Sequence, residues 1–172
     1  DASLGISQAS IVEDPARLKE RIQFVHEQVK SDALIEEYIE GRELYVAVLG
    51  NERLTRLPVW EMVFGTLGDS AAAIATRKVK WDKLYQQKHG ITTHAALDLS
   101  PTIVARLDKL SRRIYRALGM SGYARMDFRV TPAGEVYVLE ANPNPNLSED
   151  EDFSQSALAA DIAYAEMLDR IM

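Results

Sequence analysis

The amino-acid sequence predicts an α+β fold in which antiparallel strands are flanked by helices. Apolar residues recur with a period of about 3.6 along residues 15–29 and 101–118, which indicates amphipathic helices. Elsewhere, short runs rich in apolar residues are separated by glycine-containing turns, a pattern typical of meandering strands. Helices mixed with neighbouring antiparallel strands characterise the α+β class.

The N-terminal part is predicted to hold one helix and several short strands. Asp14 is placed to cap the helix with its carboxylate, and Pro15 suits the first helical position because an N–H there would have no helical partner. Short strands are expected at Ala9–Val12, Ala33–Ile39, Leu44–Leu49 and Leu54–Val63.

The rest of the chain is predicted to combine helices with one hairpin. Residues 65–95 lack a regular pattern, so a mobile loop and a short helix near Asp82–Lys88 are expected there. A long helix is predicted over residues 100–119, which begin with serine and proline and end with glycine. After the hairpin, a polar segment at 143–153 leads into a last helix from about Ser154 to the end.

Composition narrows the class of protein. The 172 residues carry 20 Lys and Arg against 26 Asp and Glu, a net charge of −6, which argues against a nucleic-acid or membrane-surface binder. There is no cysteine, and no apolar run approaches the roughly 18 residues of a membrane helix. The sequence starts at Asp1 without methionine, so we expect a piece of a longer, cytoplasmic protein, and a homodimer is compatible with it.

The hairpin near the C-terminus carries the candidate chemistry. Residues Tyr123–Val130 and Val136–Ala141 are predicted strands joined by a four-residue loop, Pro132–Glu135. If Thr131 pairs with Val136, one face carries four polar side chains: Arg125, Asp127, Glu140 and Asn142. The other face is then a core face: Met126, Phe128, Val130, Tyr137, Leu139 and Ala141.

Asp127 and Glu140 would lie opposite each other, about 5 Å apart, where two like charges destabilise a sheet. A bound cation resolves the conflict. Oxygen donors without histidine or cysteine suit Mg²⁺ or Mn²⁺ rather than zinc. Arg125 beside them is suited to a phosphate or a developing oxyanion. The competing interpretation is a solvated polar face on an edge hairpin.

Arg125-Met126-Asp127 followed by Glu140-Ala141-Asn142-Pro143 resembles the metal-binding signature of the ATP-grasp superfamily, in particular of the D-alanine–D-alanine ligases and similar proteins. The resemblance spans residues 1–172 and implies the C-terminal part of an ATP-grasp domain. It implies that Asp127, Glu140 and Asn142 bind Mg²⁺, with Mn²⁺ as an alternative, and that Arg125 contacts the transferring group.

A second match concerns the nucleotide base. Residues 34–43 resemble the adenine hinge of the family, which implies that backbone groups of Glu36, Glu37, Tyr38 and Ile39 meet the adenine edge of ATP. Glu43 would accept hydrogen bonds from the ribose hydroxyls. The family often has lysine where Glu37 stands, so a lysine contact to adenine is in doubt. A plain β-hairpin with a glycine turn is the alternative interpretation of this segment.

Two further segments resemble phosphate-binding parts of the family. Ser3-Leu4-Gly5 is similar to the end of a small-residue loop whose amides cradle phosphate, which assigns Ser3 to the nucleotide site. Residues 77–82 resemble the segment that brings a lysine onto the ATP phosphates. Lys80 is favoured because it directly precedes the aromatic residue, with Lys78 and Lys83 as alternatives.

The resemblance implies an ATP-dependent ligase that joins a small-molecule carboxylate to an amine through an acylphosphate. It also implies that an N-terminal part of the same protein supplies the rest of the cleft, so the 172 residues alone are expected to be inactive. The substrates stay open, because Asn146 stands near an expected glycine. The acidic run 149–152 either attracts an amine or is a solvated approach to the last helix, and we favour the solvated interpretation. The rival hypothesis is a non-catalytic nucleotide-binding or structural module.

Overall fold

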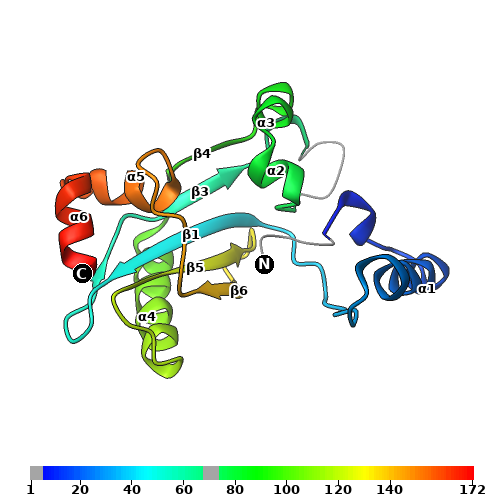
Figure 1. The fold of residues 1–172 in the computed structure, drawn as a ribbon, viewed down its shortest axis with the longest axis horizontal. Helices are drawn as coiled ribbons and strands as arrows, with labels where there is room; N and C mark the ends of the chain where they lie inside the picture. The colour runs from blue at the N-terminus through cyan, green and yellow to red at the C-terminus, as the bar shows by residue number, and fades with distance from the viewer. Residues whose placement is uncertain (1–5, 68–73) are drawn as a thin grey trace. The chain divides into compact units, whose positions relative to one another are not determined.

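The computed structural model describes residues 6–67 and 74–172 (Figure 1). By its internal contacts the chain divides into two compact units. Unit 1 comprises Asp1–Tyr38 and Phe64–Thr92, and unit 2 comprises Ile39–Val63 and Thr93–Met172. In the described ranges, no helix is long and apolar enough to cross a membrane.

Unit 1 is mostly helical. Its elements are the 3-10 turns η1 (Gln8–Ser10) and η3 (Gly65–Leu67), the π-helical turn η2 (Val25–Val29), and the helices α1 (Pro15–Phe24), α2 (Arg77–Trp81) and α3 (Lys83–His89). The predicted start of α1 is confirmed, because the carboxylate of Asp14 accepts hydrogen bonds from the backbone amides of Ala16 and Arg17, at 3.0 and 2.9 Å. The short helix expected near Asp82–Lys88 corresponds to α3.

Two predicted strands near the N-terminus are wrong. Ala9–Val12 contains the end of a 3-10 turn, and Ala33–Ile39 has no regular structure. The second segment is apolar enough to suggest a strand, but the side chains of Leu34 and Ile35 are 83% and 58% exposed. A strand requires a neighbouring strand to bond its backbone groups, and this segment has none in the described structure.

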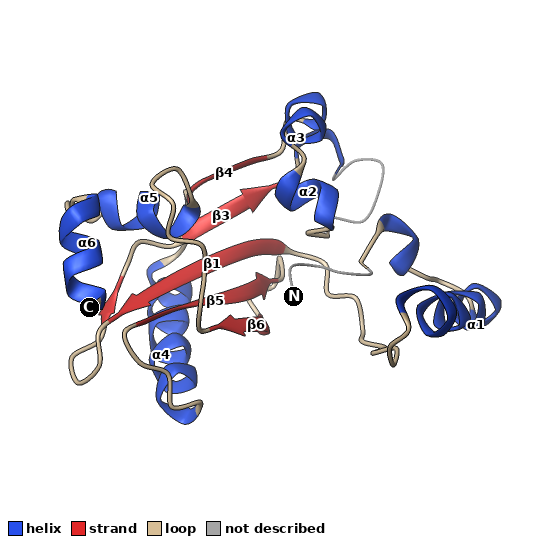
Figure 2. Cartoon of the chain, in the orientation of Figure 1, coloured by secondary structure: helices blue, strands red, loops and turns tan. Residues whose placement is uncertain are grey.

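Unit 2 is built on an antiparallel sheet. The described strands lie in the order β4-β3-β1-β5-β6, and β2 pairs with β1. Their bounds are β1 (Arg42–Leu49), β2 (Thr55–Arg56), β3 (Trp60–Val63), β4 (Thr92–Ala95), β5 (Tyr123–Val130) and β6 (Val136–Asn142). Strands β1 and β5 pair along their whole lengths, so they form the centre of the sheet (Figure 2).

Helices cover both faces of this sheet. The first face of β1, with Leu44, Val46 and Val48, packs against Leu107 and Tyr115 of α4 (Pro101–Ala117). The opposite face, with Ala47 and Leu49, packs against residues of α5 (Asp152–Leu158) and α6 (Tyr164–Ile171). The mixed architecture confirms the predicted α+β class.

Two predicted elements of unit 2 are divided in the structure. The strand expected over Leu54–Val63 is split into β2 and β3 around Pro58, which has no N–H to donate to a neighbouring strand. The carbonyl oxygen of Pro58 instead accepts a hydrogen bond from Ser156, at 3.1 Å. The last helix starts at Asp152 and is interrupted between α5 and α6, where Asp161 has a φ of 58°.

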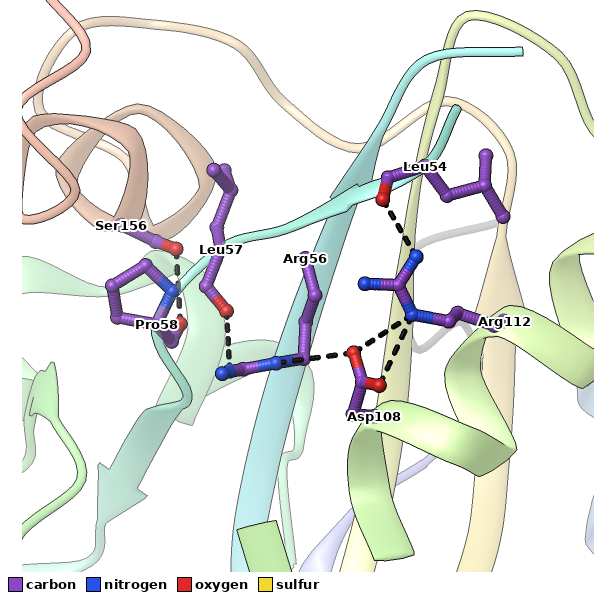
Figure 3. Close-up of polar contacts among 7 residues, drawn as sticks. All are labelled: Leu54, Arg56, Leu57, Pro58, Asp108, Arg112 and Ser156. Carbon is purple, nitrogen blue, oxygen red and sulfur yellow. Dashed lines mark hydrogen bonds and ion pairs between the residues drawn. The ribbon is translucent and has the colours of Figure 1, made fainter. Parts of the chain in front are cut away.

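A side-chain network fastens α4 to the irregular segment beside β2 (Figure 3). The carboxylate of Asp108 accepts from Nε of Arg112 at 2.9 Å and lies 3.4 Å from Nε of Arg56. The two guanidinium groups then donate to backbone carbonyls, Arg112 to Leu54 at 2.6 Å and Arg56 to Leu57 at 2.8 Å. The network supplies partners for backbone oxygens at a place where the strand ladder is interrupted.

Candidate functional site

The hairpin of β5 and β6 brings the four predicted polar residues together. Arg125 pairs with Asn142, and Asp127 pairs with Glu140, as the sequence predicts. Between Asp127 and the next pair the register shifts by one residue, and Leu139 has no partner in β5. This β-bulge keeps Glu140 on the side of the sheet that carries Asp127.

The turn end of the hairpin differs from the prediction. Val136 pairs with Val130 rather than with Thr131. The loop is closed by hydrogen bonds from the amide of Thr131 to the carbonyl of Glu135 and from the amide of Gly134 to the carbonyl of Thr131, both 2.9 Å. The predicted pairing near the turn is therefore wrong by one residue, and the bulge compensates for the error before the site is reached.

The predicted core face of the hairpin is only half correct. On β5, Met126 and Phe128 are fully buried and Val130 is nearly so. On β6, Tyr137 and Leu139 are 39% and 47% exposed, so their assignment to the core is wrong. For Tyr137 the reason is the register, because it pairs with Arg129 and therefore lies on the face of Arg125 and Asp127. Leu139 is the unpaired residue of the bulge, and β6 is the last strand of the sheet, with no neighbour on its outer side in the described structure.

Across the sheet, the polar face of the hairpin continues onto β1. Tyr45 lies opposite Asp127, and Glu43 lies opposite Arg129. Glu43, Tyr45, Asp127 and Arg129 are each no more than 4% exposed. Buried charges of this kind are stable only when they are paired and hydrogen-bonded, so their partners define the site.

Arg125 is held on several sides. Its Nε and Nη2 donate to the two carboxylate oxygens of Asp127, at 2.8 and 2.9 Å, and its guanidinium lies 4.4 Å from the ring centroid of Tyr45. Asp152 at the start of α5 lies 3.9 Å from Nη1. Burial disfavours the charge, but Asp127 and Asp152 outweigh that effect and raise the pKa of Arg125, which therefore stays cationic.

The acidic run expected to be solvated is divided by the structure. Glu149 and Asp150 are exposed, whereas the side chain of Asp152 is only 14% exposed and faces Arg125. The solvated interpretation therefore fails for Asp152. Its position at the first residue of α5, on the face of the sheet that carries Arg125, was not visible from charge pattern alone.

The donor set suits a hard divalent cation by type. The carboxylate of Asp127 already receives two N–H groups from Arg125 and retains further lone pairs. Glu140 is exposed, and Oδ1 of Asn142 accepts from the amide of Asn144 at 2.8 Å. Asp127, Glu140 and Asn142 offer only oxygen atoms, which magnesium prefers, although no cluster of three or more His, Cys, Asp or Glu occurs among the described residues.

Glu43, the predicted ribose acceptor, is buried in an ion pair. Its Oε2 lies 2.7 Å from Nη2 of Arg129, and its Oε1 accepts from the hydroxyl of Tyr45 at 2.8 Å. Burial first, and then the charge of Glu43, raise the pKa of Tyr45 well above its ordinary value, so its hydroxyl stays protonated. Sequence reasoning missed Arg129 and Tyr45, although strand alternation places Arg129 on the face of Arg125 and Asp127.

The remaining predicted contacts lie outside this cluster or outside the described chain. Glu36, Glu37 and Tyr38 belong to an exposed segment without regular structure, and Ile39 is half-buried. Their proposed contacts with adenine stay predictions.

The candidate phosphate ligands belong to unit 1. Lys80 lies on α2 and is half-buried, while Lys78 and Lys83 are exposed. The side chain of Thr76 caps α2 by accepting from the amide of Val79, at 3.3 Å. Ser3 and its neighbours lie outside the described residues, as does the part of the expected mobile loop at 68–73.

Comparison with known proteins places these features in a family. The family model described as "D-ala D-ala ligase C-terminus" matches residues 2–172. A D-alanine–D-alanine ligase of Desulforudis audaxviator is 32% identical over 163 residues, which cover 94% of this chain and 49% of that protein. The "Uncharacterized protein y4sG" of Sinorhizobium fredii is 30% identical over 172 residues, covering 100% of this chain and 48% of that protein.

Solved structures give the same result. A D-alanine–D-alanine ligase from Bacillus anthracis complexed with ATP is 26% identical to this chain and superposes with a TM-score of 0.69. The match covers 93% of this chain and 46% of that chain. The VanG D-Ala:D-Ser ligase from Enterococcus faecalis, at 23% identity, shares the fold with a TM-score of 0.74, over 98% of this chain and 45% of that chain. The chain spans about half the length of the curated relatives it matches.

Proposed function

This chain belongs to the family of D-alanine–D-alanine ligase C-terminal parts of the ATP-grasp superfamily, and on that premise we propose that its protein is an ATP- and magnesium-dependent carboxylate–amine ligase. The observation that carries the proposal is the polar face of the hairpin formed by β5 and β6. Arg125 and three residues with oxygen-donor side chains pair across it, Arg125 with Asn142 and Asp127 with Glu140.

The proposed reaction joins two small molecules. The carboxylate of one substrate takes the terminal phosphoryl group of ATP, and the amine of the other then attacks the acyl carbon and expels phosphate. Asp127, Glu140 and Asn142 would hold magnesium, which supplies positive charge that offsets the negative charge of the phosphates. Arg125, kept cationic by its carboxylate neighbours, would stabilise the negative charge that develops on the acyl oxygen.

Other residues would bind the nucleotide. Backbone groups of residues 36–39 would meet the adenine edge, and Glu43 would accept from the ribose hydroxyls. Lys80 would lie on the phosphates, together with backbone amides near Ser3. D-alanine is the first substrate to test, because the names of the curated relatives include D-alanine–D-alanine ligases.

The test uses the full-length protein. We expect ADP release that requires magnesium together with an added carboxylate and amine, screened over D-alanine, other amino acids and small acids. Asp127→Asn and Glu140→Gln should each lower this turnover by at least about tenfold. Loss of a group that only supports a metal ligand already lowers activity by about tenfold to hundredfold, and these two residues are proposed to bind the metal directly.

Glu52→Gln is the matched control, since it removes the charge of an exposed acid in the turn after β1. Its turnover should equal that of the unmodified protein. If Asp127→Asn and Glu140→Gln behave like this control, the metal-site proposal is wrong. Magnesium-dependent ATP binding without turnover on any substrate would favour a non-catalytic nucleotide-binding module instead.

A further inference from the structure

We infer that Tyr45 is a positioning residue that fixes both the proposed ribose acceptor, Glu43, and the proposed catalytic residue, Arg125. The inference rests on the proposed function, because it takes the roles of those two side chains from it. Tyr45 lies in the middle of β1, opposite Asp127 on β5, and is 2% exposed. A side chain at this place touches neither substrate in the proposed mechanism and acts through its neighbours.

The hydroxyl of Tyr45 orients Glu43. It donates to Oε1 at 2.8 Å, while Nη2 of Arg129 donates to Oε2 at 2.7 Å. A carboxylate with one donor on each oxygen has its plane fixed, so the direction of its remaining lone pairs is fixed as well. Those lone pairs are the ones that would accept from ribose hydroxyls.

The ring of Tyr45 supports Arg125. The guanidinium carbon lies 4.4 Å from the ring centroid, within the range of a cation–π contact. Asp127 holds the guanidinium through two hydrogen bonds, at 2.8 and 2.9 Å, so ring and carboxylate restrain it from different directions. One side chain on β1 therefore links a residue proposed to bind the nucleotide to one proposed to act on the acyl group.

A purely packing role does not account for Tyr45. Phenylalanine would fill nearly the same volume without placing a hydroxyl in the interior, where it must find a partner. The partner it finds is a buried carboxylate that already has an arginine. The two parts of the side chain therefore have different partners, because the hydroxyl donates to Glu43 and the ring contacts the guanidinium of Arg125.

The experiment separates these two parts in the full-length protein. Tyr45→Phe removes only the hydroxyl, and Tyr45→Leu removes the ring as well. The matched control is Tyr115→Phe, which deletes the hydroxyl of another buried tyrosine, one that donates to the carbonyl of Gly50 at 2.7 Å. The measurements are the dissociation constants of ATP, 2′-deoxy-ATP and 3′-deoxy-ATP, and kcat with saturating substrates.

For Tyr45→Phe we expect ATP binding to weaken by roughly tenfold, as the loss of one hydrogen bond to a charged group allows. The preference for ATP over the deoxy nucleotides should shrink, while kcat changes less than about twofold because the ring remains. Tyr45→Leu should in addition lower kcat by roughly tenfold. Tyr115→Phe should leave nucleotide preference and kcat unchanged.

Glu43→Gln distinguishes failure of the inference from failure of its premise. If Glu43→Gln weakens ATP binding and reduces the ribose preference but Tyr45→Phe behaves like Tyr115→Phe, the inference for Tyr45 is overturned while the proposed function stands. If Glu43→Gln changes neither quantity, the nucleotide role of Glu43 is wrong, and the inference is overturned with it. Thermal unfolding of each variant shows whether it is folded. If Tyr45→Leu does not fold, Tyr45→Met, which also lacks the ring but fills more of its volume, takes its place in the kcat measurement, and an unchanged kcat overturns the role of the ring.

Discussion

Replacing Arg129 by methionine should destabilise the protein by about 3 kcal/mol. Arg129 and Glu43 form an ion pair at 2.7 Å, and their side chains are 5% and 3% exposed. Removing one partner of a buried pair typically costs about 3–5 kcal/mol, because the other charge stays buried without compensation. Tyr45 still donates to Glu43 in the variant, so we expect a value near the lower end of that range.

The assay is urea unfolding followed by circular dichroism, with Arg170→Met as the matched control. Arg170 forms an ion pair of nearly the same length with Glu166, 2.6 Å, but these side chains are 43% and 50% exposed. Exposed pairs of this kind contribute about 0.5 kcal/mol or less, so the control should unfold almost like the unmodified protein.

A double variant tests the reason for the loss. Arg129→Met combined with Glu43→Met removes both charges, and the free energy of unfolding should recover by about 1–2 kcal/mol from the single variant, because no uncompensated charge remains. Recovery should stay incomplete, since the buried hydroxyl of Tyr45 loses its carboxylate partner. The reasoning is refuted if Arg129→Met costs less than about 1 kcal/mol, or if the double variant is no more stable than the single one.

Three further predictions concern unit 2. Gly41→Ala should cost about 2–3 kcal/mol in urea unfolding, since the added Cβ would lie 2.2 Å from the carbonyl oxygen of Val130; a loss under about 0.5 kcal/mol would contradict the packing there. Asp108→Asn should lower stability by about 1 kcal/mol or less, seen as a small fall in Tm, because the carboxylate that binds Arg112 is one-third exposed. Burial raises the pKa of Tyr45, so with rising pH the unfolded chain loses the hydroxyl proton before the folded chain does, and the stability of the fold should decline above about pH 10. Tyr45→Phe should lessen this decline, and identical pH profiles for the two proteins would contradict the raised pKa.

The site hairpin could be predicted because its signals are local. Alternation along β5 places Arg125 and Asp127 on one face, and a glycine-containing loop fixes the approximate register. The bulge at Leu139 could not be predicted, because no residue type in this strand indicates where an extra, unpaired residue lies. Two deviations, at the turn and at the bulge, cancel, and so the predicted pairing of Asp127 with Glu140 is correct.

Elements that depend on distant partners were less predictable. Ala33–Ile39 has the composition of a strand, but composition does not tell whether a neighbouring strand exists. The break between α5 and α6 contains neither glycine nor proline, so the sequence offers no stop signal. There the buried side chain of Ile162 packs with the core of α5 and α6.

The partners of the site residues were the least predictable part. Tyr45 falls in an apolar run and has the pattern of an ordinary core residue, and Arg129 has that of a surface charge. Only the pairing of β1 with β5 brings them to Glu43 and Asp127. Contacts across a sheet join residues that are far apart in the sequence, so no local pattern contains them.

The bulge in β6 also bears on the order in which the hairpin assembles. A chain that closes from the turn, starting at Val130 and Val136, would in uninterrupted register bring Leu139 rather than Glu140 against Asp127. The carboxylate pair is thus reached only after the ladder has skipped a residue. If the hairpin closes from its turn, we expect the site to form only after the bulge is passed, so substitutions that accelerate turn closure need not accelerate formation of the site.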